Sequence, residues 1–469
     1  MPIRRNLKRI VLMEFLEDRS LMTVVSTPGP LCEPTILNSA VIHLSDTKLA
    51  PQAMAAIYQA GAYLDGSYDA QTWGIVFRPE VSRDSILKSW ENSGWLASSQ
   101  TDSEIHASAL PVNDPMATSQ WAIAGVNTAS VNASAAWSRS VGQGVIVAVI
   151  DSGIDLQHPE LQGQLWVNPG EVAGNRRDDD RDGFIDDTFG ANFITNSGNV
   201  QDDAGHGTHV SGVIAAAANN NIGGVGLAPG SKIMALKVLD KFGNGSLNAA
   251  TNAIYYAVNH GAKVINASWT MGMGSPSLQT AMAYAASHNV VLVTAAGNES
   301  VNNDIIPSYP GSYRFSNVLT VGAINSAGHL ASFSNYGPSS VDVAAPGVAI
   351  LSTIPGSYDT WDGTSMAAPY VTATAALIAS LRPDYSAQQI VDQIKATAHR
   401  STELAGKIAC AGYLDAGAAT NLPAYSPPTT VTPPSRTGTT VKSTTPPIQK
   451  PAWPFRKPFP IKRTPARKK

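Results

Sequence analysis

The sequence has few cysteines and few charged residues. Only Cys32 and Cys410 are present among 469 residues, and they lie far apart, which argues against a disulfide framework or a cysteine-rich zinc site. Charged residues make up 14% of the chain and hydrophobic residues 43%, which is enough for a large core. No apolar run reaches the ~18 residues that a membrane-spanning helix needs. The composition is therefore typical of a tightly packed globular protein with two or three domains.

Negative charge is absent from the C-terminal end. Residues 424–469 contain no Asp or Glu but ten Lys or Arg, although the whole chain has a formal net charge of −3. Proline and threonine are frequent in the same stretch, which predicts an extended or disordered basic tail. The tail is a candidate for binding an anionic surface or polymer, and nucleic acid is not required to explain it. A solvated extension that binds nothing is the alternative.

The N-terminal segment is a poor secretory signal. Its basic residues precede a short apolar run, which Glu14, Glu17 and Asp18 then interrupt. The stretch MEFLEDRSLMT is similar to a segment that opens many large exported bacterial proteins. We therefore interpret residues 1–23 as an export segment, which predicts a secreted or cell-envelope protein. A frayed amphipathic helix is the alternative.

Alternating strand and helix signals begin near residue 111. Buried strands are predicted where the chain is continuously apolar, at residues 144–150, 232–239, 262–266, 290–294 and 318–322. Helices are predicted between these runs, at residues 210–218, 249–259 and 278–288, and again after Ser365. The alternation predicts an α/β domain over 111–423, with a three-layer, doubly wound, mostly parallel sheet and helices on both faces. Residues 24–110 carry fewer motifs, with a strand expected at 72–77 and a short helix at 85–90.

Three short motifs carry an Asp, a His and a Ser in that order. DSGID begins with Asp151 and follows a predicted buried strand. DAGHGTHVSG contains His206 near the start of a predicted helix, and GTSMAAP contains Ser365 just before an apolar helical run. A hydroxyl becomes an effective nucleophile when a base takes its proton and a third group orients that base. The three residues supply these parts.

Each motif also has a simpler interpretation. Asp151 fits a strand-end or helix-capping acid, and Ser365 fits a helix N-cap. His206 and His209 could form a metal pair with Asp203, although HxxH lacks the glutamate of the HExxH zinc motif. The three motifs in one order, with this glycine pattern around them, favour catalysis.

DSGID, HGTHVSG and GTSMAAP resemble the three signature blocks of the subtilisin-like serine peptidases, the subtilase family. The Asp–His–Ser order agrees with that of subtilisin, and the similarity extends from about residue 113 to 421, through the blocks INAS, TAAGN and ASFSNYGP. The resemblance implies a serine endopeptidase, a hydrolase that cuts peptide bonds through an acyl-enzyme. On matching positions, Ser365 is the nucleophile, His206 the base, Asp151 its orienting partner and Asn298 a side-chain donor to the oxyanion.

The resemblance also implies a groove for an extended protein or peptide substrate, which pairs with the backbone of two segments. A glycine is usual at Thr270, and PYVTA replaces the usual Pro-His-Val-Ala-Gly after the nucleophile, which predicts local repacking. Glu299 and Ser308 match the rim and floor of the primary specificity pocket, with a solvated loop as the alternative. The predicted substrate-binding residues are Gly243, Asn244, Gly245, Ser268, Trp269, Thr270, Glu299 and Ser308.

Structural calcium is predicted from an acidic motif and from the resemblance. DDDRDGFIDD spaces carboxylates around a glycine as an EF-hand loop does, but Phe189 stands where that loop has its bidentate Glu. Related subtilases carry a similar acidic insertion; a solvated charged loop is the alternative. Two further residues match ligands of the family's stabilising calcium site. The candidate ligands are Asp178, Asp180, Asp182 and Asp186 in the acidic motif, and Glu160 and Asn220 from the resemblance.

Subtilases are commonly made as zymogens, with an N-terminal segment that assists folding and covers the cleft. The resemblance therefore implies that residues 24–110 are a pro-segment, cut off between about 105 and 112, and that the mature enzyme is a monomer. Three rival hypotheses remain open. The chain could be a catalytically silent subtilase-fold protein that binds peptides, or a secreted structural protein whose tail is the functional part. An esterase of the α/β-hydrolase type would need G-x-S-x-G, whereas Ser365 lies in GTSMA.

Overall fold

The computed structural model describes residues 39–67, 69–78, 81–101, 112–125 and 129–423. They form two compact units, of which the first ends at Pro111 and the second begins at Val112. The predicted export segment, the basic tail and Cys32 lie outside the described residues. Those interpretations, and the proposed division of the chain into four parts, stay predictions.

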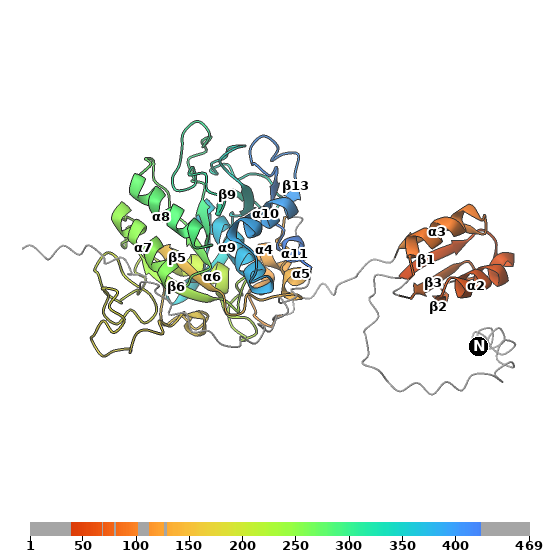
Figure 1. Cartoon of the computed structure of the whole chain (residues 1–469), viewed down its shortest axis with the longest axis horizontal. Coiled ribbons are helices and arrows are strands. Elements are labelled where there is room, and N and C mark those ends of the chain that lie inside the picture. The colour runs from red at the N-terminus through yellow and green to blue at the C-terminus, as the bar shows by residue number, and fades with distance from the viewer. Residues whose placement is uncertain (1–38, 68, 79–80, 102–111, 126–128, 424–469) are drawn as a thin grey trace, which may run out of the picture. The chain divides into compact units, whose positions relative to one another are not determined.

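The first unit is a four-stranded antiparallel sheet with two helices, and Figure 1 shows it in red and orange. Every second residue of β1 is buried, so one face of the sheet packs against the helices and the other does not. This unit has its own hydrophobic core, which its motif-poor sequence did not indicate. Its elements are β1 (Ser39–Leu44), η2 (Thr47–Leu49), α2 (Ala50–Gln59), β2 (Ala62–Ser67), β3 (Thr72–Phe77), α3 (Arg83–Asn92) and β4 (Leu96–Thr101), with strand order β2-β3-β1-β4.

The second unit contains an eight-stranded sheet in the order β13-β14-β10-β9-β8-β7-β5-β6. All neighbours are parallel except β13 and β14. The strands are β5 (Ile146–Asp151), β6 (Lys232–Lys237), β7 (Val264–Ala267), β8 (Val291–Ala295), β9 (Val318–Ile324), β10 (Val343–Pro346), β13 (His399–Arg400) and β14 (Gly412–Tyr413). A separate hairpin joins β11 (Ile350–Ile354) to β12 (Ser357–Trp361).

Helices cover both faces of this sheet (Figure 1). Helices α7 and α8 pack together on one face, whereas α6, α9 and α10 lie on the other. The helices are α4 (Trp121–Ala124), α5 (Ala133–Trp137), α6 (His206–Ala215), α7 (Leu247–Asn259), α8 (Pro276–Ser287), α9 (Thr364–Leu381), α10 (Ala387–Thr397) and α11 (Ala416–Ala419), with the short turns η3 (Ala117–Ser119) and η4 (Gln162–Gln164).

The predicted α/β architecture is confirmed. Each of the five predicted strands is present, because strands that are covered on both faces need apolar side chains throughout. Helix α6 begins at His206 rather than at Val210, since its first turn is polar and glycine-rich. The hairpin and α10 were not predicted; α10 carries a capping box between Ser386 and Gln389.

Helix α9 is the long apolar helix that follows the Ser motif. Among the described residues it alone is long and apolar enough to cross a membrane, and 78% of that stretch is buried inside the second unit, as in a core helix. The helix N-cap is Gly363, and Ser365 lies one residue inside the first turn. The N-cap interpretation of Ser365 is therefore wrong.

The predicted functional residues gather at the edge where the parallel strands end. Asp151 is the last residue of β5, Ser268 directly follows β7, and Asn298 lies in the loop after β8. Helices α6 and α9 pack against each other, and His206 and Ser365 lie in their first turns. Polar groups at this edge of an open parallel sheet face the crevice where such folds bind ligands.

Candidate active site

Asp151 and His206 form the central polar pair of the site. The Asp151 Oδ1 atom lies 2.7 Å from His206 Nδ1. The Asp151 side chain is fully buried, whereas 29% of the His206 side chain is exposed. The acceptor fixes the proton on Nδ1, so Nε2 of a neutral imidazole is free to accept a proton from a neighbouring group.

A second, buried carboxylate holds the start of α6 against the end of β5. Asp202 Oδ1 accepts hydrogen bonds from Ser152 Oγ and from the backbone of Gly205, and its Oδ2 accepts two from Thr208. Ser152 Oγ in turn accepts the N–H of Gly207 at 2.8 Å. These bonds fix the spacing between the Asp and His motifs. Sequence reasoning missed Asp202, although it directly precedes the His motif.

Glycine at position 207 is required by this close packing. A Cβ atom there would lie 2.2 Å from the carbonyl oxygen of Gly153. Gly205, the N-cap of α6, has φ +91°, in the left-handed region that favours glycine. The HGTH pattern therefore brings the helix N-terminus onto the strand end.

Ser365 lies at the same sheet edge but does not hydrogen-bond to His206 in the described structure. Its Oγ donates to the carbonyl oxygen of Ser268 at 3.0 Å, and Ser268 Oγ donates to the carbonyl of Ser365 at 2.9 Å. The structure thus brings the predicted Asp and His together and places the predicted nucleophile on a neighbouring helix.

Asn298 is oriented by the residue before the serine. Its Oδ1 accepts hydrogen bonds from the backbone N–H and the hydroxyl of Thr364, both at 2.9 Å. The amide oxygen is therefore occupied, and the exposed side chain presents its NH₂ group away from Thr364. Sequence reasoning did not single out Thr364.

The two histidines of the His motif have different environments. Burial lowers the pKa of His206, but the Asp151 carboxylate beside it outweighs burial and raises the pKa above its ordinary value of 6.5. Burial lowers the pKa of His209 to about 4. His209 binds the carbonyl of Ile350 and stacks on the Trp361 ring, with centroids 4.7 Å apart. It is a neutral packing residue.

The proposed metal pair of His206 and His209 with Asp203 has no support in these contacts. Asp203 instead forms an ion pair with Lys237 Nζ at 2.6 Å. His206 Nδ1 is engaged by Asp151, and the ring of His209 is buried. Of these two histidines, only His206 has a side chain that is partly exposed to solvent.

The predicted groove segments lie on two loops at this edge. Gly243, Asn244 and Gly245 are exposed in a turn that Asp240 organises by accepting the N–H of Asn244. Ser268, Trp269 and Thr270 run out from β7 toward solvent, with Ser268 buried and Thr270 exposed.

Thr270 has an ordinary negative φ, since it is not among the non-glycine residues with positive φ. Threonine in place of the family's usual glycine therefore causes no backbone strain at this position.

Glu299 is an exposed loop residue that is also held by hydrogen bonds. Its backbone N–H donates to Asn335 Oδ1 and its Oε2 accepts from Asn335 Nδ2 at 2.8 Å. Ser308 is partly exposed, and its N–H donates to Ser312 Oγ. The two residues lie on the same long loop that follows Asn298.

The acidic segment folds into a compact cluster of carboxylates. Asp178 accepts the N–H groups of Asp182 and Gly183, as in a tight loop around a cation. One group of side chains contains Asp180, Asp182, Asp187 and His260, and a second contains Glu171, Asp178 and Asp180.

Three carboxylate oxygens in this cluster have no hydrogen-bond partner in the described structure: Asp187 Oδ1, Asp182 Oδ2 and Glu171 Oε2. Asp187 is fully buried, and its other oxygen accepts the Tyr256 hydroxyl. Burial and the neighbouring carboxylates raise the pKa of Asp182 to about 8. An unpaired, buried carboxylate is costly unless a cation or a proton compensates it, so the donor set fits a hard divalent cation.

Three of the four candidate ligands predicted in the acidic motif, Asp178, Asp180 and Asp182, lie in these two groups of side chains. Asp186 lies outside both groups, because its carboxylate accepts the backbone N–H groups of Asn175 and Arg176. Glu171, Asp187 and His260 were missed. His260 lies far along the chain, at the end of α7, and only folding brings it near the loop.

Glu160 and Asn220 also meet, but as acceptor and donor. Asn220 Nδ2 donates to Glu160 Oε2 at 2.8 Å, and the Tyr358 hydroxyl donates to Glu160 Oε1 at 3.1 Å. Asn220 Oδ1 accepts the N–H of Ile222, which fixes the amide orientation. Burial raises the pKa of Glu160 to about 7. The pair is internally satisfied, so this arrangement does not fit the predicted calcium ligation.

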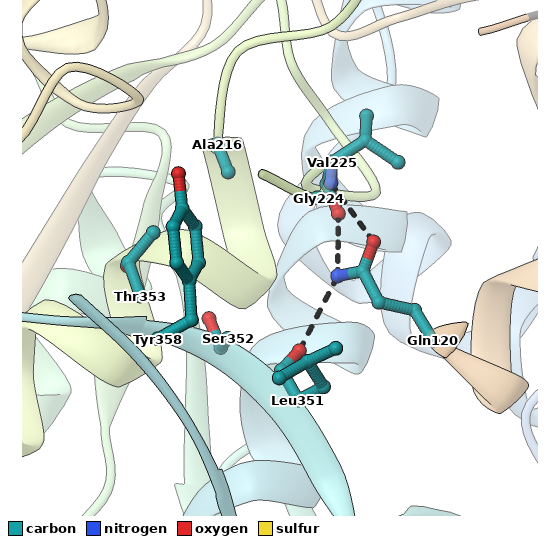
Figure 2. A pocket seen from close by; sticks show the side chains of 8 residues that line it. All are labelled: Gln120, Ala216, Gly224, Val225, Leu351, Ser352, Thr353 and Tyr358. Atoms are coloured by element: carbon teal, nitrogen blue, oxygen red, sulfur yellow. Dashed lines mark hydrogen bonds between the residues drawn. The ribbon is translucent and has the colours of Figure 1, made fainter. Parts of the chain in front are cut away.

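A small pocket lies beside this pair (Figure 2). The amide of Gln120 points into it and bonds to Val225 and to the carbonyl of Leu351. The ring of Tyr358 lies on the opposite side. None of the predicted site residues lines this pocket, and the Gln120 amide is satisfied by the backbone.

A model of the Subtilase family matches residues 142–428. Subtilisin of Bacillus pumilus is 42% identical over 260 residues, which cover 55% of this chain and 84% of that protein. Subtilisin-like protease 1 of Plasmodium falciparum isolate 3D7 is 37% identical over 296 residues, covering 59% of this chain and 43% of that protein. The corresponding protein of Plasmodium berghei is 36% identical over 288 residues. The chain spans about half the length of these Plasmodium relatives.

A solved structure described as a protease from Pseudoalteromonas arctica PAMC 21717 has the same fold, with a TM-score of 0.56 and 29% sequence identity. The similarity covers 66% of this chain and 98% of that one. It agrees with the fold predicted for the second unit.

The raised pKa of Asp182 predicts how stability depends on pH when no divalent cation is available. The folded chain holds this proton to about pH 8, whereas the unfolded chain releases it near 3.8. Between these values the folded state binds more protons, so the unfolding temperature falls as pH rises. We expect Asp182→Asn to flatten this decline in thermal unfolding with a chelator from pH 5 to 8.

The matched control is Asp179→Asn, which changes an exposed carboxylate of the same loop. It should retain the slope of the parent chain. Parallel curves for the parent and Asp182→Asn would contradict the prediction.

Proposed function

The chain belongs to the subtilase family, and on that premise we propose that it is a serine endopeptidase in which Asp151, His206 and Ser365 form the catalytic triad. The observation that supports this most directly is the 2.7 Å contact between a fully buried carboxylate and a partly exposed imidazole at the C-terminal edge of a parallel sheet. Helix α9, packed beside it, offers a hydroxyl in its first turn.

In the proposed reaction, Ser365 Oγ attacks the carbonyl carbon of the scissile peptide bond. The hydroxyl turns from Ser268 toward His206, and its proton passes to Nε2 as the C–O bond forms. The imidazolium then gives this proton to the leaving amine as the C–N bond breaks, which leaves an acyl-enzyme. Water then attacks the acyl-enzyme with His206 again acting as the base, which releases the carboxylic acid product and restores the Ser365 hydroxyl.

Asp151 orients the base and stabilises its charged form. Its Oδ1 accepts from His206 Nδ1 and from the N–H of Ser152 at 2.7 Å, which fixes the ring plane. The carboxylate stays ionised throughout and does not take the proton. The raised pKa of His206 supports this role, since a base with a pKa near the working pH is most effective.

The oxyanion is stabilised by Asn298 Nδ2 and by the backbone N–H of Ser365. Thr364 occupies the Asn298 amide oxygen, so the amide donor is pre-oriented before substrate arrives. The N–H groups at the start of α9 add favourable partial charge where negative charge develops.

The substrate is an extended polypeptide that pairs with Gly243–Gly245 on one side and Ser268–Thr270 on the other. Both segments follow strands of the central sheet, β6 and β7, at the edge where Asp151 ends β5, which suits an endopeptidase that accepts internal bonds. Glu299 and Ser308 line the primary specificity pocket.

Fluorophosphonate labelling tests the proposed nucleophile. We expect the full chain, after any self-processing, to label and to cut peptides, and Ser365→Ala to do neither while keeping its unfolding temperature. Ser287→Ala, an exposed serine on α8, is the matched control and should behave as the parent chain. A folded parent chain that neither labels nor cuts would favour the silent peptide-binding alternative.

The pH profile of kcat/KM tests the role of Asp151. The base must be neutral, so activity of the parent should rise through a pKa above 6.5. We expect Asp151→Asn to lower kcat by about 10⁴-fold and to move the acid limb to lower pH, because the neighbouring negative charge is lost.

The control variant Asp384→Asn removes a carboxylate that pairs with Arg382. It should leave both kcat and the position of the acid limb unchanged. An acid limb that stays in place in Asp151→Asn would show that another group raises the pKa.

Calcium is the second part of the proposal. The carboxylates Glu171, Asp178, Asp180, Asp182 and Asp187 would hold it, and its charge would compensate the unpaired oxygens of the cluster. The cluster is bound to α7 through Tyr256, so the cation would stabilise the loop that follows the Asp motif. Its role is structural, and no catalytic step involves it.

Calcium titration of the unfolding temperature tests this site. Added Ca²⁺ should stabilise the parent chain, by about 2.7 kcal/mol at 100 times its dissociation constant. Asp187→Asn should lose most of the response. Glu160→Gln is the matched control, because Glu160 is already satisfied by Asn220 and Tyr358. Loss of the response in Glu160→Gln instead would assign the cation to the other site.

The first unit is proposed as a pro-segment that keeps the enzyme a zymogen. Its support is a separate hydrophobic core and its position before the peptidase unit. Export to the cell envelope or the medium agrees with the secreted character expected from the sequence. The basic tail is proposed to contact an anionic surface or polymer.

A further inference from the structure

We propose that Asn335, a residue outside the triad and the oxyanion hole, positions the oxyanion donor Asn298 by holding both sides of its loop. The inference rests on the proposed peptidase function and extends it to a residue with no direct contact to substrate. Asn335 lies 37 positions after Asn298 and is fully buried beneath the loop of residues 296–301.

The side-chain amide of Asn335 makes four hydrogen bonds to this loop. Its Oδ1 accepts the N–H groups of Glu299 at 2.9 Å and Val301 at 3.1 Å. Its Nδ2 donates to the carbonyl of Ala296 at 3.1 Å and to Glu299 Oε2 at 2.8 Å. An asparagine amide offers two acceptor sites and two donors, so its capacity is fully used.

The bonded residues flank Asn298 on both sides. The backbone N–H of Asn335 adds a fifth contact, to the carbonyl of Gly297 at 2.9 Å. Gly297 has φ +111°, and a Cβ atom there would lie 2.3 Å from Asn335 Nδ2. The loop therefore closes around this amide, while the Asn298 side chain is exposed.

Thr364 and Asn335 act on different parts of Asn298. Thr364 holds the side-chain oxygen and also accepts the N–H of Gly297, whereas Asn335 holds the backbone before and after the residue. An oxyanion donor is useful only within about 2.7–3.1 Å of the developing charge, so a small backbone shift weakens it. Both anchors are thus needed to keep the donor in place.

The chemistry of the anchor requires an amide. Aspartate would keep the size and the two accepted bonds, but would lose both donors and bring a second carboxylate against Glu299. Glu299→Gln in the same chain would return an N–H donor to that contact. The pair of substitutions exchanges amide and carboxylate across one hydrogen bond.

The first comparison covers the single variants Asn335→Asp, Asn335→Ala and Glu299→Gln and the double variant Asn335→Asp/Glu299→Gln. The second covers Asn298→Ala alone and combined with Asn335→Ala. The matched control is Asn317→Ala. Asn317 is equally buried and bonds to the carbonyl of Val290, at the opposite end of β8. The readouts are kcat and KM on a peptide with an uncharged residue before the cut, the unfolding temperature, and deuterium uptake of residues 296–301.

We expect Asn335→Asp and Asn335→Ala to lower kcat by at least tenfold, with KM little changed, and to raise deuterium uptake in the loop. The loss should not exceed the ~10²–10³-fold that removal of an oxyanion donor produces. Asn335→Ala should add little to Asn298→Ala, because the two act on the same step. The double variant should recover part of the kcat lost in Asn335→Asp. Asn317→Ala should lower the unfolding temperature but leave kcat, KM and deuterium uptake of residues 296–301 unchanged.

Three results would overturn the inference. They are an unchanged kcat in folded Asn335 variants, losses that multiply with that of Asn298→Ala, and a kcat loss in Asn317→Ala of the same size. A parent chain that cuts no peptide would instead remove the proposed function, and deuterium uptake would still show whether Asn335 holds the loop.

Discussion

The structure of the site depends on a buried carboxylate that meets an imidazole at the mouth of the sheet. Asp151 has no access to water, so its charge must be compensated within the protein. His206 supplies that compensation and gains a raised pKa in return. The same contact fixes the tautomer, which leaves Nε2 available to Ser365. One hydrogen bond therefore sets the protonation state, the orientation and the basicity of the histidine.

The fold meets this constraint by close packing of backbone. Gly205 and Gly207 allow α6 to approach the end of β5, and Asp202 bonds to both segments. The proposed oxyanion donor, Asn298, is also held by buried polar residues, since Thr364 bonds to its side chain and Asn335 bonds to its loop. The proposed base and the proposed oxyanion donor are thus positioned by buried polar residues outside the triad.

Buried carboxylates also lie at two sites away from Asp151. In the acidic loop, three carboxylate oxygens have no hydrogen-bond partner among the described residues, and either a cation or a proton would compensate them. Around Glu160, Asn220 and Tyr358 supply donors, and no cation is needed. Both sites were predicted as calcium sites, the first from its acidic motif and the second from the resemblance to the subtilase family. Only the direction of the amide and hydroxyl donors separates them.

The sequence by itself determined the α/β class and the family, because local motifs carry their signal within a few positions, and the same motifs supplied Asp151, His206, Ser365 and Asn298 as the proposed catalytic residues. The tertiary structure alone decided which distant groups meet. His260 joins the acidic loop, Asp187 replaces Asp186 in it, and Asn335 reaches the Asn298 loop across 37 positions. These contacts depend on how elements pack, and no periodicity or spacing in the chain encodes the direction of a buried side chain.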